Sequence, residues 1–290
     1  MAWQGRVTTA IRGRRALAGA ALAVSLGGAL LLAFATRGAA TAPASFTVRL
    51  PPTANDRIYA SPVARGRPIV VIDAGHGGRD PGARSVSGEV AEKDLTLALA
   101  RELRDDLVKR GRVRVAMTRD DDRYLTLEDR AAVARRLNAG IFVSLHMDSA
   151  PNPLARGASV YSLSDIASDA EAARFAATEN RGGAGEYAAD GSVQAILSDL
   201  AFRAQMSASA DLASRLVNKS AGRFELRPQP HRFAAFHVLK RAATPAVLFE
   251  AGYISNVDDE LLLRSSGHRS AIALALAQAI ETDVAARSRH

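Results

Sequence analysis

The length, composition and charge of the chain fit a folded protein and exclude several kinds of site. It has 290 residues, of which 48% are hydrophobic and 23% are charged, and its formal net charge is +8. These values are ordinary for a globular protein with a sizeable core. The absence of cysteine excludes a disulfide framework, a thiolate metal site and a cysteine nucleophile.

The first 35 residues have the pattern of an export segment. Residues 1–15 carry four arginines and no acidic residue, and residues 16–35 carry no charge. A basic stretch followed by an apolar one that ends in small residues predicts a signal peptide, and the pair Arg14-Arg15 also fits a twin-arginine signal. Twenty apolar residues could instead remain as an inner-membrane anchor. Export, and the lack of a basic stripe interleaved with aromatics, argue against nucleic acid as a partner.

The rest of the chain divides into a linker and one folded domain. Residues 36–67 are rich in proline, alanine and small polar residues and predict a linker. Residues 68–290 alternate short apolar runs with helical patterns. The predicted strands are 69–75, 113–119, 141–146, 158–163 and 246–252. The predicted helices are 93–110, 127–138, 205–220 and 268–286. This alternation predicts an α/β sheet with helices on both faces.

Four polar residues fall at one edge of the predicted sheet. His76 follows the first strand within a glycine-rich turn, His146 and Glu250 end later strands, and Glu92 begins a helix. In such folds the site lies beyond the carboxyl ends of the strands. Two imidazoles with one or two carboxylates are the composition of a catalytic zinc site. The plainer interpretation is that His146 is a core histidine and Glu92 is a carboxylate favoured at a helix N-terminus. A structural role of this kind would have to apply to all four residues at the same edge.

Four motifs in order carry a resemblance to a known family. They are "VVIDAGHGGRDPGA" (70–83), "EKDLTLALA" (92–100), "FVSLHMDSA" (142–150) and "LFEAGYISN" (248–256). The chain resembles the zinc-dependent N-acetylmuramoyl-L-alanine amidases over its whole folded part. The resemblance implies a mixed, mainly parallel sheet of about six strands flanked by helices, in a single catalytic domain at 68–290.

The resemblance also implies a site and a reaction. Zn²⁺ would be held by His76, Glu92 and His146, and Glu250 would be the catalytic glutamate. The bond cut would join N-acetylmuramic acid to L-alanine in peptidoglycan. Zinc with three protein ligands leaves a position for water, and Glu250 would take the proton of that water and pass it to the leaving amine. The glycines beside His76 would let metal and substrate approach its imidazole.

Some assignments stay open at this point. Asp73, Arg130 and Asp148 are candidates to orient the ligands, with a surface or capping role as the alternative. Glu89 could replace Glu92 as ligand, although the match to "EKD" favours Glu92. Two other functions remain: a zinc peptidase that cuts within the stem peptide, and a catalytically silent homologue that only binds the wall.

The segment at 164–205 is longer than the connection that a minimal amidase core needs between its strand and the next helix. A helix is predicted at 168–180, then a glycine-rich break, then a helix around 192–205 with an apolar stripe. The stretch resembles the regulatory insertion of the periplasmic cell-division amidases, which split the septal wall to separate daughter cells. That resemblance implies self-inhibition by the first helix and docking of a LytM-domain activator on the second.

The acidic residue of the insertion that reaches the zinc region is expected to be Glu179, with Glu171 and Glu186 as alternatives. The competing interpretation is that both helices merely extend the core. In that case the apolar stripe would be buried.

Overall fold

The computed structural model describes residues 56–181 and 193–288. The predicted signal peptide or anchor at 1–35 and most of the predicted linker lie outside these residues. Among the described helices, none is both long and apolar enough to cross a membrane. The folded domain begins before residue 68, because Ile58–Tyr59, within the predicted linker, already pairs with the sheet.

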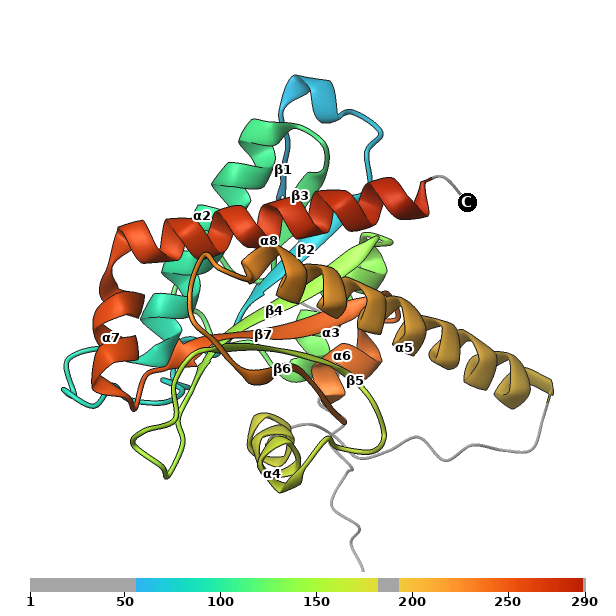
Figure 1. Ribbon diagram of the computed structural model, residues 1–290. Helices are drawn as coiled ribbons and strands as arrows, with labels where there is room; N and C mark the ends of the chain where they lie inside the picture. The colour runs from blue at the N-terminus through green and yellow to red at the C-terminus, as the bar shows by residue number, and fades with distance from the viewer. Residues whose placement is uncertain (1–55, 182–192, 289–290) are drawn as a thin grey trace, which may run out of the picture. The chain divides into compact units, whose positions relative to one another are not determined.

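A seven-stranded mixed sheet forms the centre of the described domain (Figure 1). Its strands are β1 (Ile58–Tyr59), β2 (Ile69–Ala74), β3 (Arg114–Met117), β4 (Ile141–Asp148), β5 (Ala158–Leu163), β6 (Leu226–Ala234) and β7 (Ala246–Tyr253). Their order across the sheet is β1-β3-β2-β4-β7-β5-β6. Strands β3, β2, β4 and β7 are parallel, whereas β1 and β5 run antiparallel to β3 and β7. The predicted mixed, mainly parallel α/β fold is confirmed, with seven strands in place of about six.

The sequence does not predict the two edge strands, β1 and β6. Strand β1 has two residues and cannot show a period. Strand β6 contains Pro228 and Pro230, which lack an amide hydrogen and argue against a central strand. Among the described strands, β6 pairs only with β5, and this edge position tolerates both prolines.

Helices cover both faces of the sheet. They are α2 (Glu92–Arg110), α3 (Leu127–Arg136), α4 (Ala170–Glu179), α5 (Val193–Ser220), α6 (His237–Arg241), α7 (Val257–Arg264) and α8 (Ser266–Arg287), with the 3₁₀ turn η1 (Pro62–Ala64). The predicted helices at 192–205 and 205–220 form one continuous helix, α5. No glycine or proline interrupts its sequence, so nothing ends the first helix near residue 205.

The two faces of the sheet have separate cores. Val70 and Ile72 of β2 pack with α2, α8 and the second half of α5, whereas Val71 faces the side that α3, α4 and α6 cover. In Figure 1, α8 lies across α2 on the first side, and α4 lies on the second. Because β2, β4 and β7 are neighbours and parallel, their carboxyl ends meet at one edge.

Candidate metal centre

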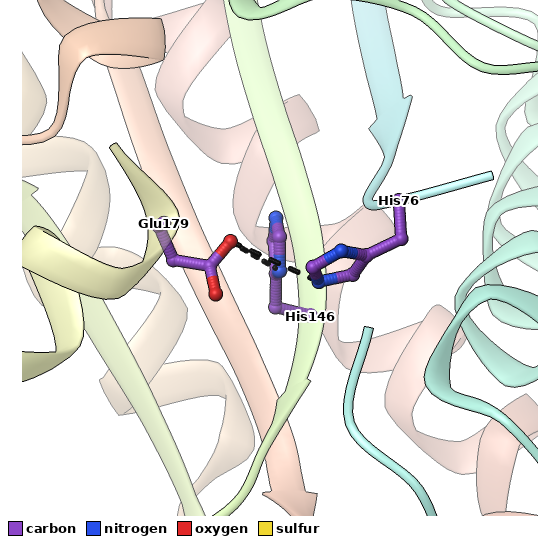
Figure 2. Close-up of side chains that lie close together, drawn as sticks. All are labelled: His76, His146 and Glu179. Atoms are coloured by element: carbon purple, nitrogen blue, oxygen red, sulfur yellow. Dashed lines mark ion pairs between the residues drawn. The ribbon is translucent and has the colours of Figure 1, made fainter. Parts of the chain in front are cut away.

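The four residues at the predicted sheet edge lie close together. His76 lies two residues after the end of β2, and His146 lies opposite Glu250 in the register of β4 and β7. Glu92 is the first residue of α2. Figure 2 shows the imidazoles of His76 and His146 turned toward a common point, with the carboxylate of Glu179 facing them from α4. The two rings are 5.0 Å apart between centroids.

Glu92 bridges the two imidazoles. One carboxylate oxygen lies 3.1 Å from Nε2 of His76, and the other lies 3.1 Å from Nδ1 of His146. The amides of Ala83 and Met147 donate to the same two oxygens, each at 2.9 Å, and fix the carboxylate in place. Burial alone would raise the pKa of Glu92, but the charge of His76 and the hydrogen bond with His146 outweigh it and hold this pKa far below its usual range.

Glu179 is the residue of the insertion that reaches this point. Its Oε2 lies 3.4 Å from Nδ1 of His146 and 3.8 Å from Nε2 of His76. His76, His146 and Glu179 thus form a group of potential metal ligands whose donor atoms all lie within 4.8 Å of one another. Glu171 is instead paired with Arg227. Glu186, the other alternative, lies outside the described residues.

The residues present fit a zinc ion. Nε2 of His76 is buried and has no hydrogen-bond partner among the described residues. Two imidazole nitrogens with carboxylate oxygens are the donor set that zinc takes in proteins. Burial lowers the pKa of His76, but the carboxylate of Glu92 and the hydrogen bond to Asp80 outweigh it and raise this pKa to about 11. The surplus of carboxylates therefore favours a cation at this point.

Asp80 is a residue of the site that the sequence analysis does not single out. Its carboxylate lies 3.0 Å from Nδ1 of His76 and orients the ring so that Nε2 faces the site. The amide of Gly82 donates to the other oxygen of Asp80 at 3.1 Å. The only available signal is the position of Asp80 in the motif, four residues after His76.

At two positions the backbone passes so close to the proposed ligands that only glycine fits. A Cβ atom on Gly75 would lie 2.7 Å from Nε2 of His146. A Cβ atom on Gly82, which also has a φ of +65°, would lie 2.6 Å from Oε2 of Glu92 and 2.6 Å from Cδ2 of His76. Any larger residue at either position would displace a ligand.

Gly77 and Gly78 have a different role from the one expected of them. A Cβ atom on Gly77 would lie 2.3 Å from the carbonyl oxygen of Arg123, and one on Gly78 would lie 2.6 Å from the amide nitrogen of Tyr124. These glycines make room for the neighbouring loop. They do not border the approach to His76.

Asp73 and Arg130 support the backbone of His76. Arg130 is ion-paired with Asp73 at 2.8 Å and donates to the carbonyl of His76 at 2.6 Å. His76 has a φ of +59°, a conformation that costs energy in a residue other than glycine. Thr118 and Ser144 donate to the two oxygens of Asp73, each at 2.7 Å. The pair thus holds the backbone of His76 through the hydrogen bond to its carbonyl oxygen.

Asp148, the third residue expected to orient the ligands, lies at the end of β4 and lines the cavity. Its own carboxylate accepts a hydrogen bond from the amide of Ser149 at 2.6 Å. Burial, followed by the charges of Glu92 and Glu179, raises its pKa to about 7.

Glu250 is buried without a partner. Both of its carboxylate oxygens lack a hydrogen-bond partner among the described residues. Burial raises the pKa of Glu250 well above its usual range, and the nearby carboxylates of Asp148, Glu92 and Glu179 raise it further. An unpartnered buried carboxyl is costly, and a strongly shifted pKa beside a cluster of potential metal ligands is typical of a functional group.

A cavity of about 610 Å³ contains the site. His76, Glu92 and His146 form its floor, and residues from Glu171 to Glu179 of α4 form one wall. The arrangement is that of a hydrolase with a metal-type ligand set at the edge of an α/β sheet. Residues 70–282 match the family described as N-acetylmuramoyl-L-alanine amidase, and the chain belongs to that family.

Known relatives agree with this assignment. The chain is 37% identical over 220 residues to the N-acetylmuramoyl-L-alanine amidase AmiA of Escherichia coli, covering 74% of this chain and 75% of AmiA. It is 36% identical to AmiC of Neisseria meningitidis, where 74% of this chain matches 52% of the relative. The catalytic domain of CwlV, an amidase from Bacillus (Paenibacillus) polymyxa, superposes with a TM-score of 0.53 at 27% identity, covering 73% of this chain and 96% of that domain. The chain is thus an N-acetylmuramoyl-L-alanine amidase of the cell-wall kind, with peptidoglycan as its substrate.

Proposed function

We propose that this amidase is zinc-dependent, with His76, Glu92 and His146 as the protein ligands. The observation that carries the proposal is the convergence of both Glu92 oxygens on the two imidazoles, each at 3.1 Å. Zinc held there supplies Lewis acidity to the scissile carbonyl and to the attacking water. Asp80 keeps Nε2 of His76 directed at the site, and Arg130 holds the His76 backbone.

Glu250 moves the proton in the proposed reaction. It accepts a proton from the attacking water and donates it to the amino group of L-alanine, the first residue of the stem peptide that leaves. Its buried position beside His146 and its two unpartnered oxygens support this role, because the carboxyl has no other hydrogen-bonding task among the described residues. The raised pKa favours the protonated form that Glu250 adopts between the two steps.

The state in the structure is proposed to be self-inhibited. Glu179 lies where a fourth ligand, or the substrate carbonyl, would approach the imidazoles. Asn180 fixes the end of α4, because it donates to the carbonyl of Ala235 and accepts from the amide of His237, each at 2.8 Å. Deleting residues 165–190 should raise basal hydrolysis. Unchanged or lost activity in a deletion variant that folds would contradict the plug.

The first half of α5 is proposed to be the docking site of a LytM-domain activator. Leu197 and Leu200 of the predicted apolar stripe are 55% and 57% exposed, which favours a docking surface over a core helix. The side chains of the other two stripe residues, Val193 and Ile196, lie outside the described ones.

The proposed setting is the periplasm or cell envelope, where septal wall is split between daughter cells. Its support is the sequence of residues 1–35, which predicts a twin-arginine or general secretory signal. N-terminal sequencing of the exported protein tests cleavage. A chain that still begins near residue 1 would favour the inner-membrane anchor.

Mass spectrometry of digested wall tests the proposed reaction. Purified full-length protein should release intact stem peptide from the glycan, lose this activity in a chelator and regain it with added zinc. A shortened stem would indicate a peptidase. Release of nothing under any condition would indicate a silent homologue, and full activity in the chelator would contradict the zinc dependence.

A further inference from the structure

Two arginines of the edge strand β6 have all their acidic partners in one helix. Arg227 makes a two-pronged contact with Glu171, at 2.7 and 3.2 Å. Arg232 pairs with Asp169, the N-cap of α4, at 2.5 Å and with Glu171 at 3.4 Å. Among the described residues, no other carboxylate is paired with either guanidinium.

Besides their partners at α4, the two arginines contact tyrosines of the sheet. The guanidinium of Arg227 lies over the ring of Tyr253 at 5.1 Å and contacts its hydroxyl. Arg232 lies 5.6 Å from the ring of Tyr161 and donates to its hydroxyl at 3.2 Å. Both tyrosines belong to central strands and are fully buried. Departure of α4 would therefore leave two fixed cations facing the space that the helix had filled.

This space leads to the metal centre. Glu171 and Glu179 belong to the same helix and line the same cavity as His76. Eight residues of helix separate them, which is about 12 Å along the axis. An extended peptide covers that distance in about three to four residues. A stem peptide that starts at the scissile bond therefore reaches the arginines with its second to fourth residues.

We propose that Arg227 and Arg232 form a subsite for the carboxylates of the stem peptide, and that Asp169 and Glu171 occupy this subsite in the inhibited state. The inference rests on the proposed function, since α4 has to leave before substrate enters. In the inhibited state, helix α4 blocks two places at once. Glu179 covers the metal centre, and the carboxylates at the other end of the helix take the place of substrate carboxylates. Guanidinium groups suit this task because they bind carboxylates with paired hydrogen bonds.

The alternative is that the arginines serve only as a latch on α4. Substituting Arg227 and Glu171 one at a time separates these possibilities. Both Glu171→Gln and Arg227→Gln break the latch and should raise basal activity. If Arg227 also binds substrate, Glu171→Gln lowers KM, whereas Arg227→Gln raises it.

The test uses full-length protein and two muropeptides that differ in one group. In one, the stem glutamate has a free α-carboxylate, and in the other this carboxylate is amidated. We expect kcat/KM to favour the free carboxylate by about tenfold in Glu171→Gln, the range for one charged hydrogen-bonded contact. The preference should vanish in Arg227→Gln and return in part in Arg227→Lys. Arg112→Gln, a variant of a 72% exposed arginine just before β3, is the control and should behave as wild type.

An unchanged preference in Arg227→Gln overturns the subsite and leaves the latch. So does an equal preference for both muropeptides in Glu171→Gln. Failure of the proposed self-inhibition would appear elsewhere, as a Glu179→Gln variant with wild-type basal rate. In that case the ratio between the two muropeptides still reports on the subsite.

Discussion

The cavity of this amidase has two walls of different construction. Beneath His76, Asp73 and Arg130 form a network inside the core, and their side chains are 1% and 4% exposed. On the other side lies α4, whose anchoring carboxylates Asp169 and Glu171 remain 42% and 29% exposed. The wall formed by Asp73 and Arg130 can be disrupted only by opening the core. The other is held by ion pairs that water can reach and by the short apolar face of α4 around Phe175.

This difference separates the parts that make the site from the part that closes it. Breaking a buried ion pair leaves an uncompensated charge in the core, so it threatens the whole domain. Partly exposed pairs contribute little each and exchange readily with water or another anion. We therefore expect substitutions in the first wall to destroy function and substitutions in α4 to increase it.

The largest expected effect is at Glu250, in the permanent part of the site. Glu250→Gln keeps the shape of the side chain but removes its ability to accept a proton. Hydrolysis of peptidoglycan should fall by about three orders of magnitude, the middle of the range for general acid–base catalysis. Zinc content, measured on the purified variant, should stay at the wild-type level. A variant with near wild-type turnover would show that Glu250 does not transfer the proton.

Arg130→Met tests whether the wall under His76 is structural. It leaves Asp73 buried without its cation, which should cost about 3–5 kcal/mol in the free energy of unfolding. Denaturant unfolding measures this loss, and zinc content should fall with it because the His76 backbone loses its support. Arg135→Met on the same helix, α3, is the control, since Arg135 forms an exposed pair with Glu128. An equal small effect of both substitutions would remove the distinction between the two walls.

Glu179→Gln tests the detachable wall. The amide is a poorer partner for the two imidazoles and for zinc, so α4 should leave the cavity more often. Basal hydrolysis should rise about tenfold, within the range of typical allosteric couplings, while the free energy of unfolding stays close to wild type. Glu128→Gln, the same change at an exposed position of α3, should leave the rate unchanged. A lower rate in Glu179→Gln would mean that the residue assists the reaction.

The smallest expected effect is at the exposed part of α5. Replacing Leu197 and Leu200 with serine should change the free energy of unfolding by less than about 0.5 kcal/mol, as is usual for surface positions. Basal hydrolysis should also stay unchanged, and only stimulation by an activator should be lost. A loss of about 2–3 kcal/mol on unfolding would instead show that these leucines belong to the core.

The strands that carry the site could be predicted because their signals are local. The apolar runs before His76 and through His146 and Glu250 are short and β-branched, and the parallel order brings their ends together. Strand β6 could not be predicted in this way, because its prolines and polar residues are allowed only by its edge position. For the same reason, the position of Arg227 and Arg232 beside α4 could not be predicted from the sequence.

The sequence by itself determined the strands that carry the site, the glycine-rich turn at His76 and the helix at 170–179, since each depends on neighbours along the chain. Only the tertiary structure decided which carboxylate of α4 faces the imidazoles. A helix turns its side chains by about 100° per residue, so its sequence defines an apolar stripe but not the groove that receives it. Packing of Phe175 against Tyr161 and Phe236 sets that rotation. It directs Glu179 to the metal centre and leaves Glu171 with the arginines of β6.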